Sequence, residues 1–216
     1  MLFKDRFDAG QQLANQLKRF ENDHPLILLV PRGGVEVGLE TIRRYQLDWD
    51  FMIPRKIGAP HNKEIAIGAV TMDGNYLLYE EYVNQIHVSS DYIQEQIQQE
   101  MIEIKRRLQQ YRGSETFPPV TNQTVILIDD GIATGFTLLA AIKSIHAHAP
   151  KKLILAVPVA PTETIKAFRQ FVDDIICLHS IDRFTSVGAY YKSFPQVTEE
   201  QMKSYIDLLN KQQVIM

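Results

Sequence analysis

The sequence predicts an α/β fold with a central parallel sheet flanked by helices. Apolar runs typical of buried strands alternate with helical patterns along the chain, and right-handed crossovers between such strands produce a parallel sheet. Residues 125–128 form the clearest run, apolar throughout as expected for a strand buried on both faces. The chain has 216 residues, which is enough for one large domain.

The N-terminal region predicts an amphipathic helix over residues 4–20. Phe7, Leu13 and Leu17 recur there at helical spacing and indicate an apolar stripe. Arg6 lies near the start of this helix and, as a charged residue, is expected on its surface.

The remaining elements are bounded by turn and capping residues. Asp73 and Gly74 predict the turn of a hairpin, and Ser89 is placed to cap a long helix. Thr198 and Gln201 predict a capping box that opens the last helix. Strands are expected over residues 26–30, 48–53, 65–71, 76–79, 125–128, 152–159 and 174–178, and helices after Gly34, Ser89, Gly135, Pro161 and Thr198.

An acidic pair and a loop of small residues follow the central strand. Asp129 and Asp130 end the strand, and Thr134 and Thr137 add hydroxyl donors before and at the start of a helix. Backbone N–H groups of such a loop and of the helix N-terminus can bind one anion. Two carboxylates suit hydroxyl groups or a hydrated Mg²⁺. A ribose 5-phosphate presents both kinds of group.

Three other kinds of site share parts of this pattern. A Walker B strand also ends in acids, but it needs a G-x-x-x-x-G-K-[ST] loop upstream, which the sequence lacks. A receiver domain carries its acidic pair after the first strand, not beyond the middle of the chain. A Rossmann site needs G-x-G-x-x-G, which is absent. The pattern therefore favours a combined phosphate and hydroxyl site.

Residues 124–137 resemble the 5-phosphoribosyl-1-pyrophosphate (PRPP) binding motif of type I phosphoribosyltransferases. The resemblance implies a type I fold with a central parallel sheet flanked by helices, a small hood subdomain, and a hairpin with a flexible lid. It also implies that Asp129 and Asp130 hold the ribose hydroxyls, directly or through Mg²⁺ or water. The loop that would hold the 5-phosphate comprises Ala133, Thr134, Gly135, Phe136 and Thr137.

Arg32, Gly33 and Gly34 form a second strand, glycine loop and helix arrangement after the first expected strand. Arginine in such a loop can hold a phosphate in a bidentate fork. In the resembled family the loop after the first core strand binds pyrophosphate, so the resemblance assigns these three residues to pyrophosphate. The alternative is a tight turn whose glycines only permit the backbone angles.

Two further cations follow the strand expected over residues 48–53. Arg55 and Lys56 at its end are candidates for the same pyrophosphate, and a solvated basic turn is the alternative. Ligands on parallel sheets lie beyond the carboxyl ends of the strands. Arg32, Arg55 and Asp129 are therefore expected to converge on one sheet edge.

The resemblance also assigns a lid and a hood. Residues 57–64 correspond to a mobile lid that excludes water, from which Lys63 or His61 would reach the leaving group. The hood selects the acceptor, commonly a base stacked on an aromatic ring. Phe184 and Tyr190 are the candidates for that ring, with core or surface packing as the alternative.

Residues 1–216 are expected to form a single phosphoribosyltransferase domain. Its core would span about residues 20–180, with the hood formed by residues 181–216 and the N-terminal helix. The Arg-Gly-Gly loop and the Phe-x-x-Val-Gly-x-Tyr-Tyr tail resemble those of a branch of predicted phosphoribosyltransferases.

Charge and composition argue against several function classes. The net charge is −3 and no basic stripe is found, so no DNA partner is expected. There is no signal peptide and no long apolar span, which predicts a cytoplasmic protein without a membrane partner. Cys177, the only cysteine, lies in an apolar stretch and is expected to be a buried strand residue rather than a nucleophile. His146 and His148 point to different helix faces, so no metal cluster is predicted.

The predicted function is transfer of the phosphoribosyl group of PRPP to a small-molecule, nucleobase-like acceptor, with release of pyrophosphate. The resemblance implies Mg²⁺ as the cofactor, and a homodimer is a further expectation. Asp129, Asp130, Arg32 and Lys63 are the candidate catalytic residues. The alternative is a regulatory protein of the same fold that binds PRPP or a nucleotide without turnover.

Overall fold

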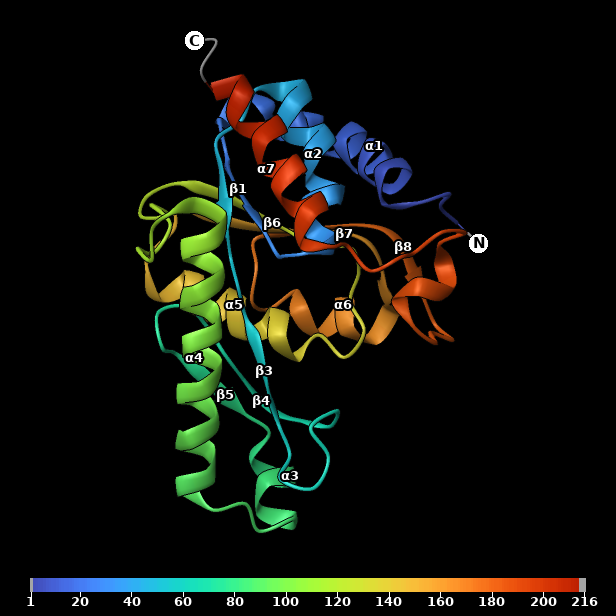
Figure 1. The fold of residues 1–216 in the computed structure, drawn as a ribbon. Coiled ribbons are helices and arrows are strands. Elements are labelled where there is room, and N and C mark those ends of the chain that lie inside the picture. The colour runs from blue at the N-terminus through green and yellow to red at the C-terminus, as the bar shows by residue number, and fades with distance from the viewer. Residues whose placement is uncertain (1, 214–216) are drawn as a thin grey trace. The chain divides into compact units, whose positions relative to one another are not determined.

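The computed structural model describes residues 2–213 (Figure 1). The chain forms two compact units. The first contains the described residues up to Phe51, then 118–134, and those from His148 onward. The second contains residues 52–117 and 135–147. The N-terminal helix and residues 181–213, which were expected to contribute the hood, both belong to the first unit.

A five-stranded parallel sheet forms the centre of the first unit. Its strand order is β2-β1-β6-β7-β8, and every neighbouring pair is parallel. This confirms the predicted parallel sheet. The central strand β6 is buried along its whole length and has a parallel neighbour on each side. The strands are β1 (Leu26–Leu29), β2 (Trp49–Phe51), β6 (Thr124–Ile128), β7 (Lys152–Pro161) and β8 (Asp174–Ile181).

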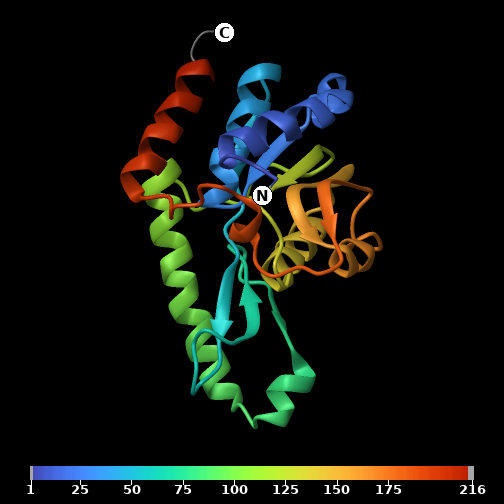
Figure 2. The ribbon, with the colours of Figure 1, turned by 90° about the vertical axis from the view of Figure 1, so that its right-hand side faces the viewer.

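Helices cover both faces of this sheet. The helices α1 (Arg6–Leu17) and α2 (Gly33–Tyr45) pack on one face and α6 (Thr162–Phe168) on the other (Figure 1). The last helix, α7 (Glu199–Gln213), packs beside α2 (Figure 2). Short 3₁₀ helices occupy Lys18–Asp23 (η1) and Val187–Tyr190 (η2).

Side chains cap the N-termini of three helices, two of them as predicted. Thr198 and Gln201 exchange side-chain to backbone hydrogen bonds at 2.9 and 3.1 Å, which confirms the predicted capping box of α7. Asp5 caps α1 by accepting a hydrogen bond from the amide of Asp8. Ser89 caps α4 in the same way.

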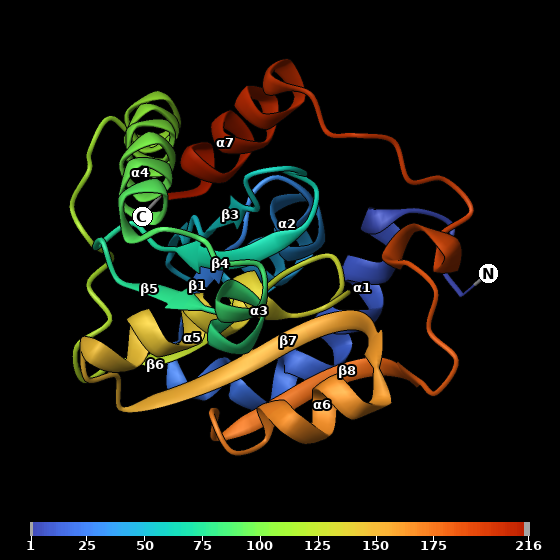
Figure 3. The same ribbon diagram turned by 90° about the horizontal axis from the view of Figure 1, so that it is seen from below.

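The second unit is built on a small antiparallel sheet. Its strands β3 (Arg55–Gly58), β4 (Ala66–Val70) and β5 (Tyr76–Leu78) lie in chain order. The β4–β5 pair is the predicted hairpin around Asp73 and Gly74. Helix α4 (Ser90–Arg112) contacts β3 and β4, and α5 (Phe136–Ala147) contacts β4 (Figure 3). A short helix, α3 (Glu80–Gln85), follows β5.

The sequence prediction was wrong about where Arg55 and Lys56 lie. They were expected at the tip of a strand over residues 48–53, but that strand ends at Phe51 and both residues lie inside β3. Pro54 has no backbone N–H to donate, which favours an interruption here. Arg55 begins the antiparallel pairing with β4, opposite Val70.

The N-terminal segment pairs with the tail in the first unit. Phe3 forms a parallel bridge with Tyr191, and the amide of Lys192 donates to the carbonyl of Phe3 at 2.8 Å. Phe3 and Tyr191 are both 2% exposed. Within residues 2–213, no helix combines the length and apolar character needed to cross a membrane.

Candidate active site

The acidic pair and the Arg-Gly-Gly loop lie next to each other in the first unit. Strands β1 and β6 are adjacent and parallel, with Leu29 opposite Ile128, so the segments that follow them leave the same sheet edge. The amide of Val30 donates to the carbonyl of Ile128 at 2.9 Å. The predicted convergence of Arg32 with Asp129 therefore agrees with the strand register.

Gly33 and Gly34 allow the two segments to approach closely. A Cβ atom at Gly33 would overlap the carboxylate of Asp130, and one at Gly34 would lie 2.6 Å from the carbonyl oxygen of Ile128. Neither glycine has a positive φ, so permissive backbone angles do not explain them. They begin α2, Arg32 is its N-cap residue, and the Pro31–Arg32 peptide bond is cis.

Arg6 forms an ion pair with Asp130, although it was expected on the surface. Its Nε lies 2.7 Å from Oδ2 of Asp130, and the residue is only 6% exposed. The guanidinium also lies 3.6 Å from the ring centroid of Phe194 and donates through Nη1 to the carbonyl of Pro195 at 2.8 Å. Cation–π contact and charge-assisted hydrogen bonds compensate for burial of the charge.

A signal for this burial was present in the sequence. Arg6 occupies the first position of the buried stripe of α1, one face of which also carries Ala9, Gly10, Leu13 and Leu17. An arginine within an apolar stripe indicates a buried partner, because charged groups are rarely buried alone. The partner itself, 124 residues away in sequence, could not be predicted.

The aromatic tail contacts the acidic pair through Tyr191. Its hydroxyl donates to the backbone carbonyl of Asp130 at 2.6 Å. The two predicted acceptor residues, Phe184 and Tyr190, stack on each other with ring centroids 5.2 Å apart and pack against the cluster around Phe3. Their proposed contact with an acceptor stays a prediction.

Burial governs the electrostatics of the pair. The pKa of Asp129 is raised well above its ordinary value, first by burial and then by the charge of Asp130. Burial also raises the pKa of Asp130, while Arg6 opposes that shift. Glu36 lies 3.8 Å from Arg6, and burial raises its pKa as well. The guanidinium of Arg6 is thus the favourable charge for three acids, Glu36, Asp129 and Asp130. A further cation or hydroxyl donors beside Asp129 would stabilise its charged form.

The donor set of Asp129 is compatible with a hydrated Mg²⁺. Its carboxylate accepts a hydrogen bond from the backbone amide of Asp130 at 2.8 Å. Mg²⁺ keeps several waters and is commonly bound by one or two carboxylates together with substrate phosphates. No group of three or more histidine, cysteine or acidic side chains in the described part of the chain could hold a metal ion by itself.

The predicted phosphate loop, residues 133–137, runs from the first unit into the second. In the first unit, Ala133 and Thr134 are exposed. In the second, Gly135 has a φ of +76° and Phe136 begins α5, with Thr137 in its first turn. The first N–H groups of a helix have no intrahelical acceptor, which suits them to bind an anion.

The remaining predicted cations interact within the second unit. Arg55 donates to Glu100 at 2.6 Å, and Lys56 donates to the backbone carbonyl of Glu64 at 3.1 Å. Lys63 donates to the hydroxyl of Tyr92 and to the amide oxygen of Gln96. Residues 61–65, within and next to the expected lid, are exposed. The pyrophosphate role of these cations stays a prediction.

Cys177 is a strand residue, as predicted. It lies in β8 and is half-buried, and burial raises the pKa of its thiol to about 11. The thiol is therefore protonated at neutral pH and is a poor nucleophile.

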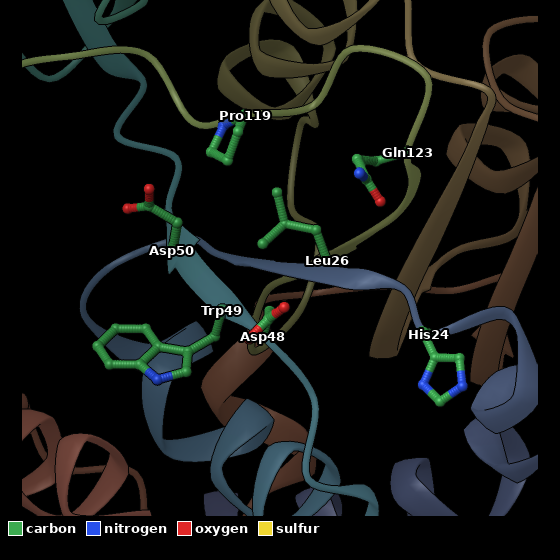
Figure 4. Close-up of a pocket in the computed structure, with 7 residues that line it drawn as sticks. All are labelled: His24, Leu26, Asp48, Trp49, Asp50, Pro119 and Gln123. Carbon is green, nitrogen blue, oxygen red and sulfur yellow. The ribbon is translucent and has the colours of Figure 1, made fainter. Parts of the chain in front are cut away.

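A separate cavity of about 290 Å³ lies in the first unit at the amino ends of β1 and β2 (Figure 4). Ligands on parallel sheets bind at the opposite, carboxyl ends of the strands. This cavity is therefore not the candidate active site. Its lining consists of His24, Leu26, Asp48, Trp49, Asp50, Pro119 and Gln123.

Comparison with known families agrees with this geometry. The model of the phosphoribosyl transferase domain family matches residues 4–192. The chain belongs to the phosphoribosyltransferase family. Two Mycobacterium tuberculosis proteins, from strains CDC 1551 and H37Rv, each carry the name "Putative phosphoribosyl transferase" and are 34% identical over 206 residues. The match covers 95% of this chain but 46% of theirs, so the chain spans about half the length of these relatives.

One solved structure is similar to this chain over almost its whole length. The crystal structure of TT1426 from Thermus thermophilus is 32% identical to this chain, with a TM-score of 0.78. The similarity covers 95% of this chain and 98% of TT1426. The predicted type I phosphoribosyltransferase fold, with its central parallel sheet flanked by helices, is confirmed.

Proposed function

We propose that this phosphoribosyltransferase binds Mg²⁺-PRPP and transfers the phosphoribosyl group to a nucleobase-like acceptor, with release of pyrophosphate. One observation carries the proposal. The acidic pair that ends β6 lies against the Arg-Gly-Gly loop that follows the adjacent strand β1, in a chain that matches the family. This arrangement supplies acceptors for ribose hydroxyls beside a cation for phosphate.

Each part of PRPP is assigned to a different set of residues. Asp129 and Asp130 hold the ribose hydroxyls, and the 133–137 loop holds the 5-phosphate through its backbone N–H groups and hydroxyls. Arg32, with the N–H groups of Gly33 and Gly34, holds the pyrophosphate. Its guanidinium lies 3.7 Å from Glu199, at the N-terminus of α7.

The reaction replaces one bond at C1 of the ribose. The bond to the pyrophosphate oxygen breaks, and a nitrogen or oxygen of the acceptor forms the new bond and releases its proton to the solvent. No nucleophile is therefore required from the protein. Negative charge develops on the pyrophosphate as it leaves, and Arg32 stabilises it. When bound, Mg²⁺ supplies further neutralisation of the pyrophosphate.

Selection of the acceptor is assigned to the tail. Phe184 and Tyr190 offer aromatic faces on which a planar base can stack. Leu178, Ile181 and Val187 pack in the same cluster, which gives these rings apolar support.

Calorimetric titration of Mg²⁺-PRPP tests the proposal. The wild type is expected to bind, and the Asp129→Asn/Asp130→Asn variant to bind at least about a hundredfold more weakly. Asp182→Asn/Asp207→Asn is the matched control, since it removes two exposed acids of the first unit. Absence of wild-type binding at millimolar PRPP would overturn the proposal.

A second measurement identifies the reaction. Pyrophosphate release is followed with a panel of purine and pyrimidine bases. Release with one base names the acceptor. PRPP binding without release in any mixture would instead favour the regulatory alternative.

A further inference from the structure

The side chain of Arg6 is held in place by three contacts. It uses Nε for Asp130 and Nη1 for the carbonyl of Pro195, and its planar face lies on the ring of Phe194. These contacts fix the guanidinium from both the acidic loop and the tail. The side chain therefore has little freedom to follow a ligand.

Asp130 is engaged by the protein on several sides. Its Oδ2 accepts from Arg6, its carbonyl accepts from Tyr191, and its amide donates to Asp129. Gly33 lies so close to the carboxylate that no side chain fits between them. Asp130 thus joins the acidic loop, the Arg-Gly-Gly loop and the tail.

Asp129 differs sharply from its neighbour. Its carboxylate accepts a hydrogen bond from the backbone amide of Asp130, and the guanidinium of Arg6 donates to the neighbouring acid instead. A carboxylate offers about four acceptor positions, so the backbone donor leaves positions on Asp129 for substrate hydroxyls or metal-bound water. Arg6 donates to Asp130, so Asp130 and not Asp129 holds the hydrogen bond from this guanidinium.

We propose that Arg6 is a positioning residue for the proposed reaction, acting through Asp130, and that Asp129 is the acid of the pair that makes the main contact with the ribose hydroxyls or metal-bound water. The inference rests on the proposed function. It assigns different tasks to two adjacent acids: Asp130 fixes the loop, and Asp129 meets the ligand.

A double-mutant cycle tests whether Arg6 acts through Asp130. Mg²⁺-PRPP affinity is measured by calorimetry for the wild type, Arg6→Met, Asp130→Asn and the double variant. Each single change is expected to weaken binding about tenfold, and the double variant also about tenfold rather than about a hundredfold. A multiplicative loss in the double variant would overturn the positioning role. A rescue variant, Arg6→Lys, keeps the charge and is expected to bind more tightly than Arg6→Met.

A comparison of Asp129 and Asp130 variants tests whether Asp129 makes the main contact with the ligand. Asp129→Asn is expected to weaken binding at least about a hundredfold, about ten times more than Asp130→Asn. Equal losses would overturn the assignment of separate tasks. This comparison remains decisive where Arg6→Met fails to fold, and thermal unfolding of each variant excludes loss of structure as the cause.

Arg19→Met is the matched control for the loss of a cation. Arg19 pairs with Asp174 at 2.7 Å, but its side chain is 55% exposed, so affinity is expected to stay at the wild-type value. These measurements distinguish a failure of the proposed function from a failure of the inference about Arg6 and Asp129. If the wild type does not bind PRPP, the proposed function falls and the inference with it. If the wild type binds and the cycle is multiplicative, the inference alone falls.

Discussion

The hydroxyl of Tyr191 donates a hydrogen bond of 2.6 Å to the backbone carbonyl of Asp130. A residue of the tail thereby satisfies a polar group of the loop that follows the central strand, 61 positions earlier. Tyr191 is almost wholly buried against Phe3 and Phe194. Its hydroxyl is therefore part of the interior of the site, and burial raises its pKa.

Tyr191→Phe is expected to destabilise the first unit. The change removes the hydroxyl and leaves the Asp130 carbonyl without its donor, which costs about 1–3 kcal/mol. Urea unfolding followed by fluorescence of Trp49 measures this, because it is the only tryptophan and lies in the first unit. Tyr190→Phe is the control, since its hydroxyl makes only a 3.5 Å contact with Arg183. Equal unfolding free energies for both variants would contradict the prediction.

Gly33→Ala is expected to abolish PRPP binding. The added methyl group would collide with the Asp130 carboxylate and approach Nε of Arg6, forcing the two loops apart. Overpacking of this kind also costs about 1–3 kcal/mol of stability. Calorimetry with Mg²⁺-PRPP and urea unfolding measure the two effects. Gly113→Asn, at an open helix end with φ of +68°, is the control, because Asn tolerates that conformation. Wild-type affinity in Gly33→Ala would refute the close approach.

Cys177 is expected to make stability fall at alkaline pH. Burial raises the folded-state pKa from 9.0 to about 11, so the folded state holds the proton more tightly than the unfolded state. The stabilisation is fully present below pH 9.0 and is lost as pH rises toward about 11. The measured quantity is the difference in unfolding free energy between wild type and Cys177→Ala at several pH values, because other groups titrate there too. A constant difference would contradict the shift.

Glu103 is expected to contribute weakly to the second unit. Hydrogen bonds from Arg106 and then Arg107 lower its pKa from 4.5 to about 2. Its stabilisation is present above pH 4.5 and lost as pH falls through about 2. Since these pairs on α4 are partly exposed to solvent, Glu103→Gln should cost no more than about 1 kcal/mol at about pH 6. Far-UV circular dichroism during thermal unfolding tests this, and about 1 M salt should reduce the difference. If Glu103→Gln still lowered the free energy of unfolding at about pH 2, the ion pairs of Glu103 with Arg106 and Arg107 would not be the cause.

Local signals in the sequence predicted most of the parallel sheet and the position of its loops. The apolar run 125–128 became a fully buried central strand, and the strands over residues 26–30 and 152–159 are its two neighbours. Because parallel neighbours end at the same edge, the loops after two of these strands were expected to meet. Hydrophobic patterns and turn residues suffice for such elements, since they act over short stretches of chain.

The features that were missed depend on pairings between distant residues. Arg6 looked like a surface charge because its partners, Asp130 and Pro195, lie far away in sequence. Arg55 was placed at a strand tip because nothing before Pro54 shows that the chain changes sheets. Tyr191 could not be separated from Tyr190, since the tail lacks the regular period that identifies a buried face.

The contacts that Tyr191 and Pro195 make with Asp130 and Arg6 bear on how the acidic loop folds during synthesis. Translation proceeds from the N-terminus, so the acidic loop leaves the ribosome before Tyr191 and Pro195 have been made. A nascent chain that stops short of Tyr191 lacks a donor for the Asp130 carbonyl and an acceptor for Arg6. The acidic pair therefore reaches its final geometry only when residues 191–195 have emerged.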